Sequence, residues 1–235
     1  MAKRRYTAKS RNLQPAPMTM TFATPDTTGG SYYIDLSQCA SLINRRFYRQ
    51  GLCWSVAGIK VSAPGTGAVT IAKIPTNWVS FNAWKKAQAM WNKQQKEALA
   101  ESGGESSEAK FRDFKIYADT EHVTAGFASN LLPIDITGNP FAPGEWQPSQ
   151  IVLPNVNADA SGSTVDPAER FLHMVGPNVF GSLSRGIVEG YADSRAYPQS
   201  PDPVSPDMGD TDNWMARMFD VGNDMEEVLD NTTGS

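Results

Sequence analysis

Residues 52–74, LCWSVAGIKVSAPGTGAVTIAKI, decide the fold that the sequence predicts. Two runs rich in Val and Ile, at residues 52–62 and 68–74, alternate larger apolar side chains with small or polar ones. Such alternation is typical of strands, and the proline and glycines between the runs are typical of the turn that joins two antiparallel strands. The stretch therefore predicts a β-hairpin.

Period-two alternation recurs in short segments along most of the chain. Between Glu121 and Glu169 the sequence has no Lys or Arg and is dense in Pro, Gly, Asn and Asp, which indicates long ordered loops. The pattern as a whole predicts a mainly β protein. The alternating segments cover residues 18–24, 31–36, 111–118, 122–128, 149–154 and 170–177, and residues 186–196 fit either a strand or a helical turn.

One prominent helix is expected at residues 76–101. Thr76 or Asn77 can serve as its N-cap, its interior is rich in Ala, Lys, Gln and Glu, and a Ser-Gly-Gly sequence ends it. Packing of its apolar stripe on the domain is favoured over stacking on nucleic-acid bases, although aromatic residues interleaved with lysines fit both. A shorter helix is expected at residues 37–47, with Ser37 as its cap. The stripe consists of Phe81, Trp84, Ala87, Trp91 and Leu99.

The charges of the chain are separated toward its two ends. The net charge is -4, yet residues 201–235 hold nine acids against Arg217 alone, which is -8, so residues 1–200 carry +4. The first sixteen residues hold five basic residues and no acid. We therefore expect a flexible basic arm at residues 1–16, a folded domain at 17–198, and a Pro-rich linker with an acidic tail at 199–235. A short amphipathic helix is expected within that tail.

Catalysis has little support in the sequence. His122 and His173 lie far apart in strand-like patterns, and Cys39 and Cys53 are fourteen residues apart without the second Cys or His that a zinc site needs. No P-loop, dinucleotide fingerprint or nucleophile elbow occurs. We predict a protein that is not an enzyme and that binds no metal or cofactor.

The same composition predicts where the protein resides. No apolar run is long enough to cross a bilayer, and no apolar segment follows the basic start of the chain. Two cysteines give no disulfide framework. A soluble protein made in a reducing compartment is therefore expected, without a membrane partner.

Five stretches carry a resemblance to a known family. They are YYIDLSQCASLINRRFYRQGLCWSVAGIKV (32–61), FKIYADTEHVTAG (114–126), GEWQPSQIVLPN (144–155), GIVEGYADSRA (186–196) and NWMARMF (213–219). Together they resemble the capsid proteins of small circular, Rep-encoding single-stranded DNA viruses, the circovirus-like lineages of environmental samples. The resemblance implies a single jelly roll, in which two four-stranded antiparallel sheets pack face to face beside one prominent helix and long loops. It also implies assembly into a small icosahedral shell around a circular single-stranded DNA genome.

In such a shell the basic arm faces inward, and its cations neutralise phosphates without reading sequence. The arm has too few positive charges to neutralise a genome alone. Three arginines near the end of the 37–47 helix are therefore included among the candidate phosphate contacts, although they also fit a helix cap with surface ion pairs. The acidic tail, which packaged DNA repels, lies outside or along a subunit contact anchored by Trp214, Met218 and Phe219. The candidate nucleic-acid-binding residues are Lys3, Arg4, Arg5, Lys9, Arg11, Arg45, Arg46 and Arg49.

The expected partners are thus further copies of the chain, single-stranded DNA and a host receptor that the sequence does not identify. The expected location is the virion and the host cell interior during assembly, and the cluster at residues 3–5 also fits a nuclear import signal. Two alternatives stay open: a non-assembling single-stranded nucleic-acid-binding accessory protein, and a ligand-binding β-sandwich whose loops present aromatics such as Trp146. The stretch without Lys or Arg argues against the first, and the basic arm argues against the second.

Overall fold

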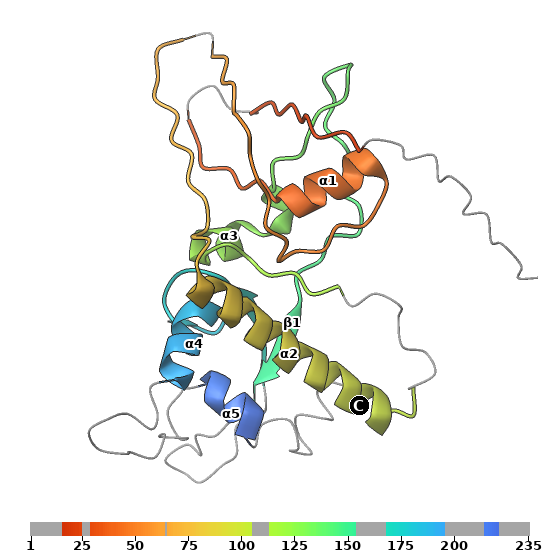
Figure 1. Cartoon of the computed structure of the whole chain (residues 1–235), viewed down its shortest axis with the longest axis vertical. Helices are drawn as coiled ribbons and strands as arrows, with labels where there is room; N and C mark the ends of the chain where they lie inside the picture. Colours follow the sequence, from red (N-terminus) through yellow and green to blue (C-terminus); the bar gives the residue numbers. More distant parts are fainter. Residues whose placement is uncertain are drawn as a thin grey trace, which may run out of the picture.

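The computed structural model describes residues 16–24, 29–63, 65–104, 113–153, 168–195 and 214–220. Figure 1 shows α2, α4 and α5 gathered around β1 toward one end of the molecule, and α1 toward the other. In chain order the elements are α1 (Leu36–Asn44), α2 (Trp78–Glu101), α3 (Thr120–Ala125), the 3-10 helix η2 (Phe127–Ser129), β1 (Gln150–Leu153), β2 (Ala168–His173), β3 (Val179–Phe180), β4 (Ser184–Gly186), α4 (Ile187–Ser194) and α5 (Trp214–Asp220).

The strands form one mixed sheet in the order β1-β2-β4-β3. β1 is antiparallel to β2, β2 is parallel to β4, and β4 is antiparallel to β3. The expected jelly roll of two four-stranded antiparallel sheets is therefore wrong: the described residues form a single sheet with a parallel pair, alongside five α-helices. Alternation states which face of a strand would be buried, but it does not state which strand would pair with it.

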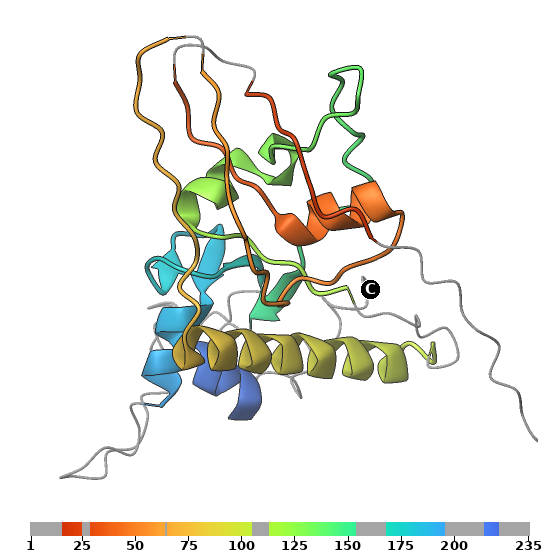
Figure 2. The same cartoon turned by 45° about the horizontal axis from the view of Figure 1, so that its top comes forward.

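The largest departure from the sequence prediction is at residues 52–76, which we call the extended loop. In the described part of this loop, residues 52–63 and 65–76, no residue belongs to a strand and no backbone group forms a hydrogen bond. The predicted β-hairpin is therefore wrong. Figures 1 and 2 both show the two legs of the loop projecting from the body and returning to it at the start of α2.

The outer edge of β1 offers the extended loop no place to pair, because Gln94 of α2 covers it. The Gln94 side chain donates from Nε2 to the carbonyl oxygen of Val152 at 2.7 Å. Its Oε1 accepts from the Val152 N–H at 3.3 Å. One amide side chain thus takes the place of the two backbone bonds that a further strand would make.

The prominent helix is confirmed. Asn77 is its N-cap, and the Asn77 side chain accepts from the Ser80 N–H at 2.8 Å. Trp84 and Ala87 are buried, so packing on the domain is confirmed for the middle of the stripe. Phe81, in contrast, is about half exposed, with the Lys85 ammonium 4.6 Å from its ring centroid.

Two shorter helices differ from the sequence prediction in detail, and a third settles an alternative that the sequence left open. Asp35, rather than Ser37, caps α1 by accepting from the Ser37 N–H at 2.9 Å. Helix α3 lies where a strand was predicted at residues 122–128, because the Asp119 carboxylate caps it by accepting from the His122 N–H at 2.8 Å. Helix α4 settles the alternative at residues 186–196 in favour of a helix.

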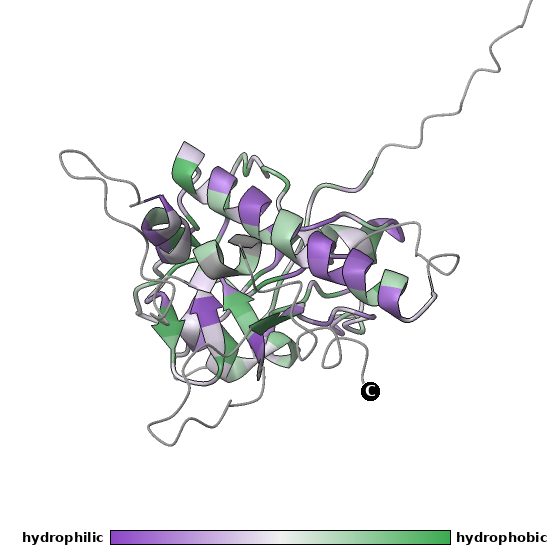
Figure 3. Cartoon of the chain, turned by 90° about the horizontal axis from the view of Figure 1, so that it is seen from below, coloured by the Kyte–Doolittle hydropathy of each residue, from purple (hydrophilic) through white to green (hydrophobic). Residues whose placement is uncertain are grey.

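The main core lies between the sheet and the helices α2, α4 and α5. Phe114 sits at its centre, with ring centroids 5.6 Å from Trp84 and 5.5 Å from Trp91. Figure 3 shows hydrophilic and hydrophobic residues mixed along α2, whose buried residues pack on this core. The buried members of the core are Ala83, Trp84, Ala87, Met90, Phe114, Ile116, Ile151, Leu153, Leu172, Met174, Ile187, Trp214, Met215 and Met218.

Helix α5 lies in the sequence segment that was predicted as an acidic tail, yet it packs on α4 and α2 of its own chain. The Trp214 indole N–H donates to the Asn178 side-chain oxygen at 2.5 Å. Gly190 of α4 makes this close approach possible, since a Cβ there would lie 2.9 Å from the Trp214 nitrogen. In the part of the chain that the structure describes, no helix has both the length and the apolar character needed to cross a membrane.

Candidate assembly surface

The extended loop exposes a row of apolar side chains. Their exposed fractions range from 40% to 62%, although Val and Ile are normally among the most buried residue types. Both legs of the loop contribute to the row, on each side of the loop tip. Exposed apolar surface of this kind marks an interaction site. The residues are Val56, Ile59, Val61, Val69, Ile71 and Ile74.

The base of the extended loop is firmly anchored to the body. The Trp54 indole N–H donates to the Ser37 hydroxyl of α1 at 3.0 Å, and its ring packs on Tyr48 at 5.7 Å between centroids. Gly51 has a φ of 82°, and a Cβ there would lie 2.5 Å from the Trp84 ring. Only glycine therefore fits at this position against the ring. Because the second leg runs directly into α2, the loop is held at both ends while its legs project into solvent.

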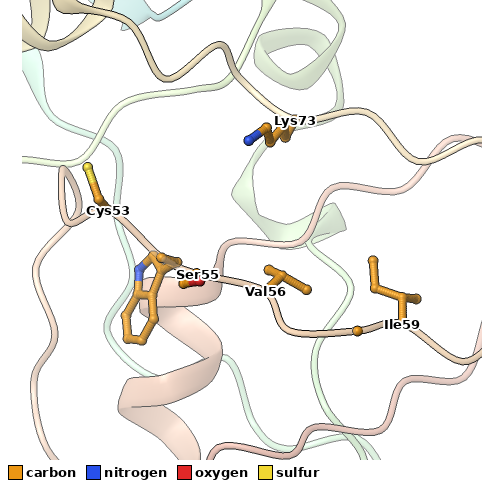
Figure 4. Close-up of a pocket in the computed structure, with 7 residues that line it drawn as sticks. Cys53, Ser55, Val56, Ile59 and Lys73 are labelled. Carbon is orange, nitrogen blue, oxygen red and sulfur yellow. The ribbon is translucent and has the colours of Figure 1, made fainter.

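The hollow at the base of the loop does not resemble a ligand pocket. It has a volume of about 580 Å³ and is lined by positions of one leg between Cys53 and Ile59, together with Lys73 of the other. Figure 4 shows the labelled side chains standing apart from one another instead of converging on a point. Ligand sites usually hold a few polar groups aimed at a common centre, which this hollow lacks.

A second projecting segment is residues 134–145, which we call the 134–145 loop. Asp135 holds its turn by accepting from the Thr137 N–H at 2.8 Å and the Asn139 N–H at 3.0 Å. Ile136 at the tip is fully exposed, at 105%. Figures 1 and 2 both show this loop and the extended loop at the same end of the molecule, on opposite sides. The sequence predicted long loops between Glu121 and Glu169 but did not single out this one.

Arg45, Arg46 and Arg49 are exposed on one turn that follows α1. Arg45 has a φ of 49° and its N–H caps the helix on the Ser41 carbonyl, while the Ser37 hydroxyl donates to the Arg49 carbonyl at 3.1 Å. Among the described residues none of the three arginines forms an ion pair. We call this segment the arginine turn, and its backbone is fixed while its cations face solvent.

The first described residues lie beside the arginine turn. The Asn44 side-chain amide donates to the Pro17 carbonyl at 3.2 Å, which places the start of the described chain at the end of α1. The sequence alone could not show this contact, because Asn44 and Pro17 are 27 positions apart. The five arm residues themselves, Lys3, Arg4, Arg5, Lys9 and Arg11, lie outside the described residues.

The predicted subunit contact has a different environment from the one expected. Trp214 and Met218 are buried in the core of their own chain, at 3% and 0% exposure, and the side chain of Phe219 lies outside the described residues. Figure 1 places α5 at the opposite end of the molecule from α1. The contacts of Trp214 and Met218 are thus accounted for within the chain, and a role between subunits stays a prediction.

The two histidines are buried, and each hydrogen-bonds through both ring nitrogens. His122 donates from Nε2 to the Asn130 side-chain oxygen at 2.7 Å, and its Nδ1 accepts from the Ala118 N–H at 3.1 Å. His173 donates from Nε2 to the Pro177 carbonyl at 3.0 Å, and its Nδ1 lies 2.9 Å from the Ser184 hydroxyl. Because a hydroxyl can reverse its role and an amide N–H cannot, a second proton fits His173 but not His122.

Acidification is expected to destabilise the protein through His122. Burial lowers the pKa of His122 in the folded chain, against smaller opposing effects of Asn130, Asp119 and Asp35. The unfolded state therefore takes up the proton first, and stability is lost as the pH falls below the ordinary histidine pKa of about 6.5. Urea unfolding at pH 7.5 and pH 5 should show a lower midpoint at pH 5. Burial also lowers the pKa of His173, so His173 contributes to the same difference. The His122→Gln variant should therefore lose part of the difference, and a variant with the full difference would contradict the assignment.

The metal-ligating and nucleophilic side chains are scattered in the part of the chain that the structure describes. No group of three or more His, Cys, Asp or Glu side chains among them could hold a metal ion. Burial, with a smaller contribution from Asp35, raises the pKa of the Cys39 thiol to about 12, which makes it a poor nucleophile. Cys53 is exposed but has no histidine among the residues that line its hollow. Comparison of the chain with protein-family models, curated proteins and solved structures finds no match.

Proposed function

We propose that the chain is a viral coat protein, which assembles in many copies into a small icosahedral shell around circular single-stranded DNA. The observation that carries the proposal is that basic and acidic segments lie toward opposite ends of the molecule. One end carries the arginine turn and the first described residues, which follow the basic arm in the sequence. The other end carries α5, which an acidic segment follows in the sequence. A subunit of a shell needs such a polarity, because one side meets nucleic acid and the other does not.

The cations at the basic end suit binding to phosphates without sequence readout. The arm and the arginine turn together hold eight Lys and Arg residues within the first 49 positions. About sixty copies would bring about 480 positive charges to the enclosed space, which is fewer than the phosphates of a genome of a few thousand nucleotides. The arginine turn adds its charges to those of the arm, but together they do not neutralise all the phosphates of the genome. Further cations are therefore expected inside the particle.

The acidic end supports the same orientation of the subunit. Residues 221–235 follow α5 and contain four acids without any Lys or Arg. Placing this segment near packaged DNA would be unfavourable, because like charges repel across the Debye length of about 8 Å at physiological salt. The end that carries α5 is therefore assigned to the outside of the shell.

The exposed extended loop favours an assembling protein over an accessory protein that acts as a monomer. A monomer gains nothing from six exposed Val and Ile side chains on a loop anchored at both ends. The alternative of a ligand-binding β-sandwich has lost its support, since the described residues form one sheet and the hollow lacks convergent polar groups.

Purified full-length protein is expected to form particles of some tens of subunits that protect single-stranded DNA from nuclease. Electron microscopy and light scattering measure the size, and the salt dependence of binding measures the phosphate contacts. Replacing Arg45, Arg46 and Arg49 with Gln should reduce the slope of log affinity against log salt by about 2, because each cation bound to a single-strand phosphate contributes about 0.7 to that slope.

The matched control removes the same charge from α2, by replacing Lys85, Lys93 and Lys96 with Gln. That variant should keep the salt slope of the wild type if the arginine turn, and not the net charge, contacts DNA. A wild-type protein that stays monomeric and binds DNA with strong salt dependence would overturn the coat-protein proposal and favour the accessory protein.

A further inference from the structure

We infer that the extended loop of one copy docks on the 134–145 loop of a second copy, and that this head-to-tail contact builds the assembly. The inference rests on the proposed function and names the contact through which the copies assemble. It begins from the extended loop, whose described residues have the sequence of strands but make no backbone hydrogen bonds.

The partner of the extended loop is not the sheet of the same fold. Gln94 occupies the outer edge of β1 through both the N–H and the carbonyl of Val152. The opposite edge strand, β3, has only two residues, Val179 and Phe180. A loop with two legs of about twelve residues each cannot be satisfied by so short an edge.

The charges of the two loops are complementary. The extended loop contains Lys60 and Lys73 and no acid, whereas the 134–145 loop contains Asp135 and Glu145 and no Lys or Arg. All four residues are exposed. Opposite charges at the rim of a contact set its register and exclude wrong pairings, such as two extended loops with their lysines together.

The apolar parts of the two loops also suit each other. Ile136 is fully exposed at the tip of the 134–145 loop, and the side chains of Val56, Ile59 and Ile71 are more than half exposed on the extended loop. Burying them against one another removes apolar surface from water on both copies, which is the main source of affinity in a protein contact.

The positions of the two loops make the contact head-to-tail. They project from the same end of the molecule on opposite sides, so one copy cannot bring its own loops together, but it can offer one to each of two neighbours (Figures 1 and 2). A contact between two different surfaces closes into a ring or shell when the rotation between copies allows. Each copy therefore carries one donor loop and one acceptor loop.

The test uses two variants of the full-length chain. The donor variant replaces Val56, Ile59 and Ile71 with Ser, and the acceptor variant replaces Ile136 and Glu145 with Lys. These side chains are exposed and have no hydrogen bond to the body, so both variants should unfold at the same urea concentration as the wild type. Each should raise the protein concentration needed for assembly by at least about tenfold, which light scattering measures.

An equimolar mixture of the two variants distinguishes this contact from others. Each variant keeps one intact loop, so the mixture should form dimers that do not grow, as seen by analytical ultracentrifugation. A control with Val175→Ser and Leu183→Ser, which are exposed apolar residues outside both loops, should assemble as the wild type does.

Other results would overturn the inference in identifiable ways. Normal assembly of both variants would leave the coat-protein proposal standing and remove the loop contact. Normal assembly of the acceptor variant alone would show that the extended loop meets another surface. A wild-type chain that stays monomeric at every concentration would overturn both the contact and the proposed function.

Discussion

Replacing Trp214 with Ala is expected to lower the free energy of unfolding by about 3–5 kcal/mol, the range for truncating a buried aromatic residue. Trp214 is 3% exposed against α4 and α2, and its indole N–H is the partner of the Asn178 side-chain oxygen. The substitution leaves a cavity and also removes the donor of that hydrogen bond, and these costs add. Urea unfolding followed by circular dichroism measures the loss.

The chain supplies a matched control for Trp214 in Trp78, which is 62% exposed at the start of α2. The same substitution there should cost less than about 1 kcal/mol, because little apolar area is lost from the interior. Equal losses for the two variants would mean that α5 is not part of the core of its own chain. That result would restore the simpler expectation that Trp214 belongs to a contact between subunits.

Replacing Phe114 with Ala is expected to have a comparable effect, about 3–5 kcal/mol, from a different cause. Phe114 is 2% exposed and joins α2 to the chain that leads into α3, through ring contacts with Trp84 and Trp91. Its removal leaves a cavity at the centre of the core, between α2 and the sheet. Phe114→Leu, which keeps most of the volume, should recover more than half of the loss.

The control for Phe114 is Phe81→Ala on the exposed side of α2. Alanine is the better helix former, so this variant should be close to neutral in urea unfolding. A large loss at Phe81 together with a small one at Phe114 would contradict the placement of the core between α2 and the sheet.

Local features of the fold could be predicted from the sequence. Helix α2 begins beside Asn77 because that side chain satisfies one of its first backbone donors, and this signal is carried by neighbouring residues alone. The segments around β1 and β2 were also expected, at residues 149–154 and 170–177 against Gln150–Leu153 and Ala168–His173 in the structure. In each case the information lies within a few positions of the element.

Pairing between distant segments could not be predicted. Residues 52–74 alternate as strands do, but a strand forms only where a second strand pairs with it through hydrogen bonds. Period-two alternation does not show whether such a partner exists. The candidate site shows the same division. The clustering of Arg45, Arg46 and Arg49 was visible in the sequence, whereas the meeting of Pro17 with Asn44 beside them depends on the tertiary fold.

The bond between Gln94 and Val152 has a consequence for protein held at high local concentration. An open sheet edge is the surface on which amyloid-like stacking starts, and a chain packed in many copies would be at particular risk of it. By closing that edge with a helix side chain, the molecule removes a surface on which irreversible aggregation could start. Gln94→Ala should therefore reveal itself first as thioflavin-binding fibres in concentrated solution.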